Sequence, residues 1–173
     1  MHKYVFKPYN DIFPALFESE KKRLTPYLVQ FEYQIEHGGS TAIPGLGGKG
    51  IVDIYIVSAH ENLEAISQAM EKAGYMPQKR IADDSHIFHC IELPDPVDGV
   101  RRYHIHINTS DAPDYVNAMH FRDYLRNNPS EAKKYADIKI KAAEEANDDK
   151  ETYMAIKAPV ILEILQLANT KNR

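Results

Sequence analysis

The chain has 173 residues, of which 43% are hydrophobic and 27% are charged, with a formal net charge of −4 at pH 7. This length predicts a single domain, residues 1–173, that can bury a sizeable core. The acidic balance argues against general affinity for nucleic acid, because nucleic-acid-binding proteins usually carry a basic surface.

Hydrophobic periodicity and turn signals predict, in chain order, a helix, two strands, a helix, two strands and three helices. The expected bounds are 10–29 for the first helix, 31–37 and 51–57 for the strands, 61–73 for the second helix, 85–93 and 102–108 for the next strands, and 112–127, 130–146 and 149–169 for the last helices. The last two strands read as a hairpin with a long loop, LPDPVDGV. This order predicts an α+β fold, a small mixed β-sheet with flanking helices and a helical C-terminal third.

The N-terminal sequence and the length of the apolar runs predict where the protein is located. The N-terminal residues MHKYVFKPYN lack the basic-then-apolar pattern of a signal peptide. No run approaches the roughly 18 apolar residues that span a bilayer. We therefore expect a cytoplasmic protein with no membrane partner. The one cysteine, Cys90, excludes an internal disulfide, and its apolar surroundings predict a buried core thiol.

A glycine-rich turn, His37-Gly38-Gly39-Ser40-Thr41, follows the first predicted strand. Glycines have no Cβ, so their backbone N–H groups can approach an anion closely. The hydroxyl of Ser40 adds a donor, and Lys49 can place a point charge on a phosphate. A tight turn without a ligand is the simpler interpretation of the glycines alone, because the pattern is neither a Walker A nor a GxGxxG motif.

Asp53 strengthens the case for a site. It lies inside the apolar strand Ile51-Val52-Asp53-Ile54-Tyr55-Ile56-Val57, where an unpaired buried carboxylate would be costly. Side chains alternate along a strand, so Asp53 and Tyr55 share one face and the aliphatic residues form the other. Asp53 is therefore either a metal or substrate ligand or one partner of a salt bridge.

The sequence resembles the GrpB family in three separated segments. HGGSTAIPGLGGKGIVDI is similar to that family's signature, and it carries His37, Gly39, Ser40, Thr41, Pro44, Gly45, Leu46, Lys49, Asp53 and Ile54. HIHI at 104–107 and FRDYLRNNP at 121–129 resemble later family segments, in the same order. The resemblance implies a small sheet of the nucleotidyltransferase type. Some relatives are fused to dephospho-coenzyme A kinase, which hints at nucleotide or coenzyme A chemistry.

Tyr55 departs from the superfamily pattern that this resemblance implies. Nucleotidyl transfer commonly uses two divalent ions about 3.5–4 Å apart, held by carboxylates. The second carboxylate would stand two residues after Asp53, where this chain has Tyr55. Glu92 and Asp98 are possible replacements. Without one of them, a single ion or a magnesium–nucleotide complex could still bind.

Two histidines of the last predicted strand, His104 and His106, share one face because they are two residues apart. Imidazole pairs suit Zn, Mn, Fe or Ni better than Mg. If this strand neighbours that of Asp53, a His-His-Asp site forms; otherwise the histidines only hydrogen-bond or contact phosphate. His86 and His89 point to opposite faces, so at most one of them can join such a site.

Basic residues supply further candidates for phosphate binding. Arg122 and Arg126 lie four apart on a predicted helix and face the same way, and arginine suits bidentate recognition of phosphate. Arg102 precedes the histidine strand and can point to its polar face. Solvated arginines or salt bridges explain these residues as well. Two lysines at positions that match the family, Lys139 and Lys157, read equally well as surface residues.

These observations predict a protein that binds a phosphorylated ligand, most simply a nucleotide, with a divalent ion (Mg²⁺ or Mn²⁺, with Zn²⁺ as an alternative). Gly39, Ser40, Thr41, Lys49, Arg102 and Arg122 would bind the phosphates. Asp53, His104 and His106 would hold the metal or act in catalysis as acid or base. If the protein is catalytic, it would transfer a nucleotidyl or another phosphoryl-linked group. A non-catalytic nucleotide or coenzyme A binding module and a His-His-Asp metal-dependent hydrolase are the alternatives.

Overall fold

The structure, a computed structural model, describes residues 6–78, 85–147 and 149–171. Its elements in chain order are α1 (Phe13–Leu28), β1 (Tyr33–Gly38), η1 (Ser40–Ala42), β2 (Val52–Ser58), η2 (His60–Asn62), α2 (Leu63–Lys72), β3 (Met76–Pro77), β4 (His86–Asp95), β5 (Gly99–Asn108), α3 (Pro113–Asn127), α4 (Pro129–Glu145) and α5 (Lys150–Lys171). The α+β class and the helical C-terminal third expected from the sequence are confirmed.

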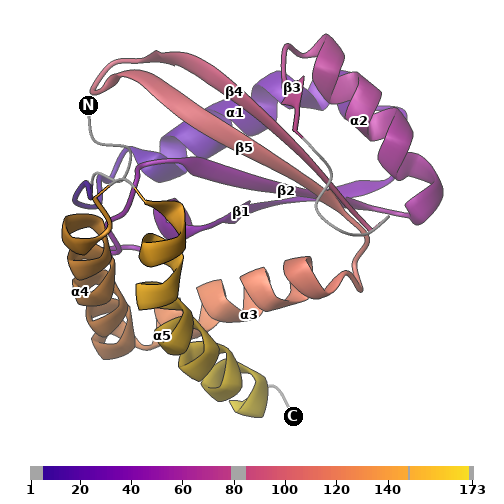
Figure 1. The fold of residues 1–173 in the computed structure, drawn as a ribbon. Coiled ribbons are helices and arrows are strands. Elements are labelled where there is room, and N and C mark those ends of the chain that lie inside the picture. The colour runs from indigo at the N-terminus through magenta and orange to yellow at the C-terminus, as the bar shows by residue number, and fades with distance from the viewer. Residues whose placement is uncertain (1–5, 79–84, 148, 172–173) are drawn as a thin grey trace.

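The sheet is mixed and has five strands in the order β1-β2-β5-β4-β3 (Figure 1). The central strands β2 and β5 are parallel, while the other pairs are antiparallel. In this register Asp53 pairs with His104 and Tyr55 pairs with His106. Strands that are distant in sequence therefore carry the candidate residues side by side.

The two faces of the sheet serve different purposes. On one face, Val52, Ile54 and Ile56 of β2 join Ile105 and Ile107 of β5 in a core that α1 and α2 cover. Burial of these aliphatic side chains is the main stabilising term. The other face looks toward α3, α4 and α5 (Figure 1), which pack around a smaller core of their own that includes Leu125 and Ile164. The strand alternation read from the sequence therefore separates core from site.

Three local expectations were wrong. The hairpin loop is short, because β4 and β5 continue to Asp95 and from Gly99, leaving residues 96–98 between them. The Asp95 carboxylate closes this turn by accepting the backbone N–H groups of Val97 and Asp98 at 2.9 and 2.7 Å. The strand β3 was not expected, because two residues carry no periodicity. Cys90 is half-buried on the face of His104 rather than within the core.

Within the described residues, no helix combines the length and the apolar composition that crossing a bilayer requires.

Candidate functional site

Asp53, His104 and His106 meet on the sheet face that looks toward the C-terminal helices. Nδ1 of His104 lies 3.1 Å and Nε2 of His106 lies 3.5 Å from Oδ1 of Asp53. One possible ligand atom from each side chain lies within 4.8 Å of the other two. About a fifth of each side chain is exposed. The three side chains that strand alternation placed on polar faces therefore converge on one point.

The chemistry of these three donors fits a divalent ion. Burial alone would raise the pKa of Asp53, but hydrogen bonds from His104 and His106 outweigh it and hold the pKa well below its usual range. Asp53 is therefore a carboxylate anion at neutral pH. One carboxylate and two imidazoles suit Zn²⁺, Mn²⁺, Fe²⁺ or Ni²⁺, whereas Mg²⁺ prefers oxygen ligands throughout. The donor set thus favours Mn²⁺ or Zn²⁺ among the expected ions.

Tyr55 occupies the position at which the sequence resemblance led us to expect a second carboxylate. Its ring stacks on that of His106, with centroids 4.5 Å apart and planes 11° apart. Burial, reinforced by the negative charges of Asp53 and Asp114, raises the pKa of Tyr55, so the phenol stays neutral. Tyr55 therefore provides an aromatic support for His106 and no charge.

The double glycine of the turn is required by the side chains of β2. Gly39 has φ +63°, and a Cβ there would lie 2.0 Å from Oδ2 of Asp53. At Gly38, a Cβ would lie 2.3 Å from the ring of Tyr55. The sequence interpretation explained these glycines by an anion. The structure adds a different cause, the close approach of the turn to Asp53 and Tyr55.

Hydrogen bonds of Thr41 fix the glycine-rich turn to the neighbouring backbone and to His37. The Thr41 hydroxyl donates to the carbonyl of Ile51 at 3.0 Å and lies 3.0 Å from Nε2 of His37. His37 stacks on Phe17, and burial lowers its pKa to about 4. Thr41 is 1% exposed, so the direct phosphate contact expected of it is not available in this arrangement.

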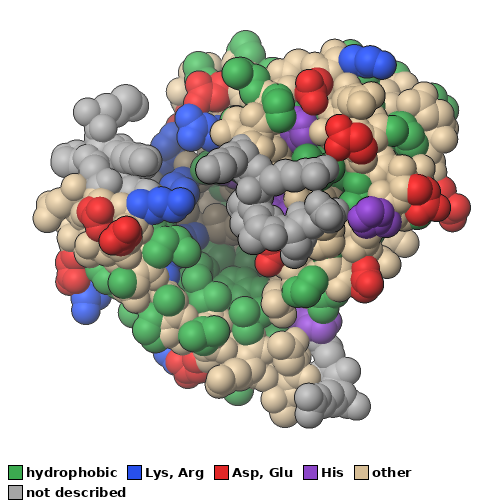
Figure 2. All heavy atoms as spheres, turned by 45° about the vertical axis from the view of Figure 1, so that its right-hand side comes forward, with side chains coloured by type: hydrophobic (Ala, Val, Ile, Leu, Met, Phe, Trp, Pro, Cys, Tyr) green, Lys and Arg blue, Asp and Glu red, His purple; other side chains and the backbone are tan. Residues whose placement is uncertain are grey.

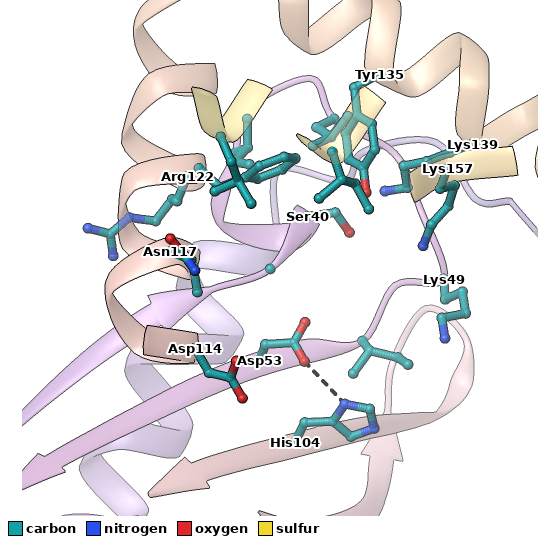
Figure 3. Close-up of a pocket in the computed structure, with 18 of the residues that line it drawn as sticks. Ser40, Lys49, Asp53, His104, Asp114, Asn117, Arg122, Tyr135, Lys139 and Lys157 are labelled. Atoms are coloured by element: carbon teal, nitrogen blue, oxygen red, sulfur yellow. Dashed lines mark hydrogen bonds and ion pairs between the residues drawn. The ribbon is translucent and has the colours of Figure 1, made fainter. Parts of the chain in front are cut away.

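A cavity of about 610 Å³ lies between this face of the sheet and the C-terminal helices. Figure 3 shows Asp53 and His104 along its base, with Ser40 facing Asp53 across it and three lysines on one side. Gly39 also lines it. Apolar side chains gather in the hollow seen in Figure 2, with basic side chains along one edge. The apolar wall consists of Ile43, Leu46, Ile51, Ala118, Phe121, Met154, Ile161 and Leu165.

Three lysines, Lys49, Lys139 and Lys157, line the same side of this cavity (Figure 3). Lys139 is 5% exposed, and its ammonium donates to the carbonyl of Gly47. Burial, reinforced by the charge of Lys157, lowers the pKa of Lys139 to about 7. Burial and the charge of Lys49 lower the pKa of Lys157 to about 8. The lysines thus form a mutually repelling cluster that an anion would stabilise.

Lys139 and Lys157 could not be separated from surface lysines by sequence, since both lie on helices rich in charged residues. A signal was present at Gly48. A Cβ at this glycine would lie 2.6 Å from both Lys139 Nζ and Ser40 Oγ. The glycines after Pro44 therefore admit a buried ammonium group, and only the tertiary packing reveals which lysine supplies it.

The guanidinium groups of the predicted arginines are paired with carboxylates. The Arg122 guanidinium points out of the cavity (Figure 3), where it donates to Glu36 at 2.8 Å, to Asp123 at 2.7 Å and to the carbonyl of His37 at 3.0 Å. This network ties α3 to β1. Arg102 pairs with Glu92 on the surface and does not line the cavity. Both guanidinium groups are therefore engaged by carboxylates.

The carboxylates proposed to replace the one missing at Tyr55 are also engaged elsewhere. Asp98 pairs with Lys7 and Arg101 at 2.9 Å each, and Glu92 pairs with Arg102. A different carboxylate, Asp114 in the first turn of α3, projects into the cavity opposite the lysines (Figure 3). Nothing in the sequence singles Asp114 out, because its approach depends on how α3 crosses the sheet.

The family profile described as "GrpB protein" matches residues 3–167. The chain belongs to the GrpB family. The UPF0157 protein BH1888 of Halalkalibacterium halodurans is 32% identical over 164 residues, 93% of this chain and 80% of that protein. The fold is similar to the crystal structure of the conserved protein GrpB from Enterococcus faecalis, with a TM-score of 0.82 and 26% identity over 97% of this chain and 99% of that one. These two relatives extend the family resemblance over nearly the whole chain.

A more distant likeness is to the Cid1 poly(U) polymerase, with a TM-score of 0.44 and 11% identity, covering 73% of this chain and 44% of that one. At this distance the likeness carries no inference about activity.

Proposed function

We propose that this GrpB family protein binds a nucleotide, or a similarly phosphorylated molecule, together with a divalent metal ion. The observation that carries the proposal is the pairing of two opposite elements in one cavity. The converging ligands Asp53, His104 and His106 lie at its base, and the lysine cluster lies on one side. A cation and a chain of phosphates would complement the two elements respectively.

The charge state of the lysine cluster supports a polyanionic ligand. Among the described residues, no carboxylate lies within ion-pair distance of Lys139 or Lys157, whose ammonium groups instead meet the Gly47 carbonyl and the Tyr153 ring. Burying an ammonium group without a counter-charge is costly. A phosphate chain beside Ser40 would remove this cost, and Lys49 at the cavity edge would add to the neutralisation.

The rest of the cavity suits the organic part of the ligand. Its volume falls within the range typical of small-molecule sites. The apolar wall carries Phe121 and Met154, against which a nucleobase or a pantetheine-like chain could pack. With the ligand so held, Asp53, His104 and His106 would bind the ion, which would polarise a phosphoryl oxygen. A histidine not engaged by the ion would be available to move a proton from the acceptor.

A non-catalytic binding module is the second candidate, and Tyr55 favours it. With a neutral phenol in place of the second carboxylate, the site lacks the charge that a second ion needs. A family member of this kind would sense its nucleotide or coenzyme A-like ligand without transferring a group. The His-His-Asp donor set is also compatible with hydrolysis of the ligand, which gives different products.

Calorimetric titration of ATP and coenzyme A in the presence of Mn²⁺ or Zn²⁺ tests the proposal, with thermal unfolding as a second readout. Ligand at 100 times its dissociation constant should stabilise the fold by about 2.7 kcal/mol. Asp53→Asn should abolish the metal-dependent part, while Asp137→Asn, which removes a carboxylate from the exposed face of α4, should not. Absence of binding with any of these metals and ligands would overturn the proposal.

The products then separate the candidates. Pyrophosphate release from ATP with an acceptor indicates nucleotidyl transfer, and release of inorganic phosphate indicates a hydrolase. Binding without either product, across a broad set of hydroxyl and amine acceptors, favours the module.

A further inference from the structure

His86 on β4 links the candidate metal site to helix α3. Its Nε2 lies 3.1 Å from Nδ1 of His106, and the two rings stack with centroids 5.3 Å apart. On the opposite side of the ring, its Nδ1 lies 3.3 Å from Oδ2 of Asp114. The side chain of His86 is 6% exposed and that of Asp114 is 65% exposed. A continuous row therefore runs from Asp53 through His106 and His86 to Asp114.

The row has a carboxylate at each end and, with both rings neutral, two N–H protons for three gaps. The gap between Nε2 of His86 and Nδ1 of His106 needs one of them. The contact between His86 and Asp114 at 3.3 Å lacks hydrogen-bond geometry, so the second proton belongs between His106 and Asp53 in the metal-free protein. A cation beside Asp53 would replace that proton on Nε2 of His106. The two protons would then lie on Nδ1 of His106, toward His86, and on Nδ1 of His86, toward Asp114.

We propose that His86 and Asp114 are positioning residues that set the tautomer of His106 and so direct its Nε2 lone pair at a divalent transition-metal ion. This inference rests on the proposed function for the metal itself. Outer partners of this kind orient a histidine ligand and raise its basicity. Tyr55 fixes the plane of the His106 ring by stacking. The orientation of the ring and its tautomer therefore depend on different residues.

The arrangement also explains the placement of Asp114. It stands in the first turn of α3, directly after Pro113, and therefore links the helical third to the sheet through a side chain. The other histidine of β4, His89, points to the opposite face, where its Nε2 lies 3.2 Å from the Ser67 hydroxyl and the side chain is fully buried. His86 and His89 thus provide a matched pair on one strand, only one of which reaches the site.

Metal titration without nucleotide tests the proposal, using Zn²⁺ and Co²⁺ with wild type, His86→Phe, Asp114→Ala and His89→Phe. Loss of an outer partner typically weakens metal binding 10–100-fold. We expect a loss in this range for His86→Phe, a smaller loss for Asp114→Ala, and affinity within about twofold of wild type for His89→Phe. The double variant of His86 and Asp114 should lose little more than His86→Phe alone, since both act through one ring. Unchanged affinity in both single variants would overturn the proposal.

The tautomer supplies a readout that a merely structural role would not move. Nitrogen NMR should show the His86 proton on Nε2 in the metal-free protein and on Nδ1, toward Asp114, once Zn²⁺ is bound. A His86 that keeps its proton on Nε2 in the zinc-bound protein would contradict the inference. Wild-type protein that binds no metal would instead overturn the proposed function, and this inference with it.

Discussion

The ring of Tyr55 lies flat against that of His106, with 4.5 Å between centroids and 11° between planes. A neutral aromatic side chain of β2 therefore supports a histidine of β5 and contributes no charge to this face. If Asp53, His104 and His106 bind a metal as we propose, the donor set is one carboxylate and two imidazoles, which suits ions that accept nitrogen ligands better than Mg²⁺.

Substitution of Tyr55 tests this assignment. Tyr55→Phe keeps the stacking and should bind Zn²⁺ within about twofold of wild type. Tyr55→Ala removes an aromatic contact worth about 0.5–1.5 kcal/mol, so we expect binding that is weaker by roughly 2- to 12-fold. Calorimetry of both variants with Zn²⁺ makes the comparison. If Tyr55→Phe loses as much affinity as Tyr55→Ala, the hydroxyl and not the stacking supports the site.

The close approach of Gly39 to Asp53 gives a second prediction. A methyl group at residue 39 would displace the Asp53 carboxylate, so Gly39→Ala should abolish metal binding. It should also cost at least about 1–2 kcal/mol of stability, because φ is positive there. Gly45→Ala is the control, since Gly45 has φ +77° and open space around its Cβ position.

Urea unfolding measures the strain in both glycine variants, and calorimetry measures metal affinity. We expect both to be destabilised and only Gly39→Ala to lose the metal. Metal binding that survives in Gly39→Ala would show that the turn can move away from Asp53 at little cost.

The sequence predicted the elements well because their signals are local. The alternation in Ile51–Val57 separated Asp53 and Tyr55 from the core, and the two-residue spacing of His104 and His106 put both on one face. The sheet order then decided whether these faces meet, and no local pattern carries that information. Lys139, Lys157 and Asp114 reach the cavity from helices that are distant in sequence, so their role depends on tertiary packing. Arg122 shows the converse, since a suitable residue type is used for a salt-bridge network.

We expect replacement of Lys139 to raise the stability of the fold and to weaken phosphate binding. Its pKa in the fold is about 7, below the ordinary value of 10.5, so the unfolded chain binds more protons between these pH values. Stability of the wild type should therefore rise as pH increases from about 7 toward 10.5. Lys139→Met does not bury an ammonium group and so avoids this cost. The variant should therefore exceed wild type in stability most at or below pH 7, and the difference should shrink at higher pH.

Urea unfolding of wild type and Lys139→Met at pH 6 and pH 9 makes this comparison, with Lys133→Met on the exposed side of α4 as the control for losing a helical lysine. The same Lys139→Met variant should bind tripolyphosphate more weakly than wild type. A stability difference that does not change with pH would contradict a lowered pKa for the buried Lys139.

The two halves of the cavity predict that phosphate and organic group are recognised separately. Met154 lines the apolar wall and is 45% exposed, so Met154→Ala should leave the fold intact. We expect it to weaken ATP binding about tenfold, from the loss of roughly 1.5 kcal/mol of apolar contact, and to leave tripolyphosphate binding unchanged. Leu162→Ala is the matched control, because Leu162 is an exposed apolar residue of the same helix that does not line the cavity.

Lys157→Met should weaken the binding of both ligands, since the lysine cluster would meet phosphates in either case. If Met154→Ala weakens tripolyphosphate binding as much as ATP binding, the organic group does not pack against the apolar wall.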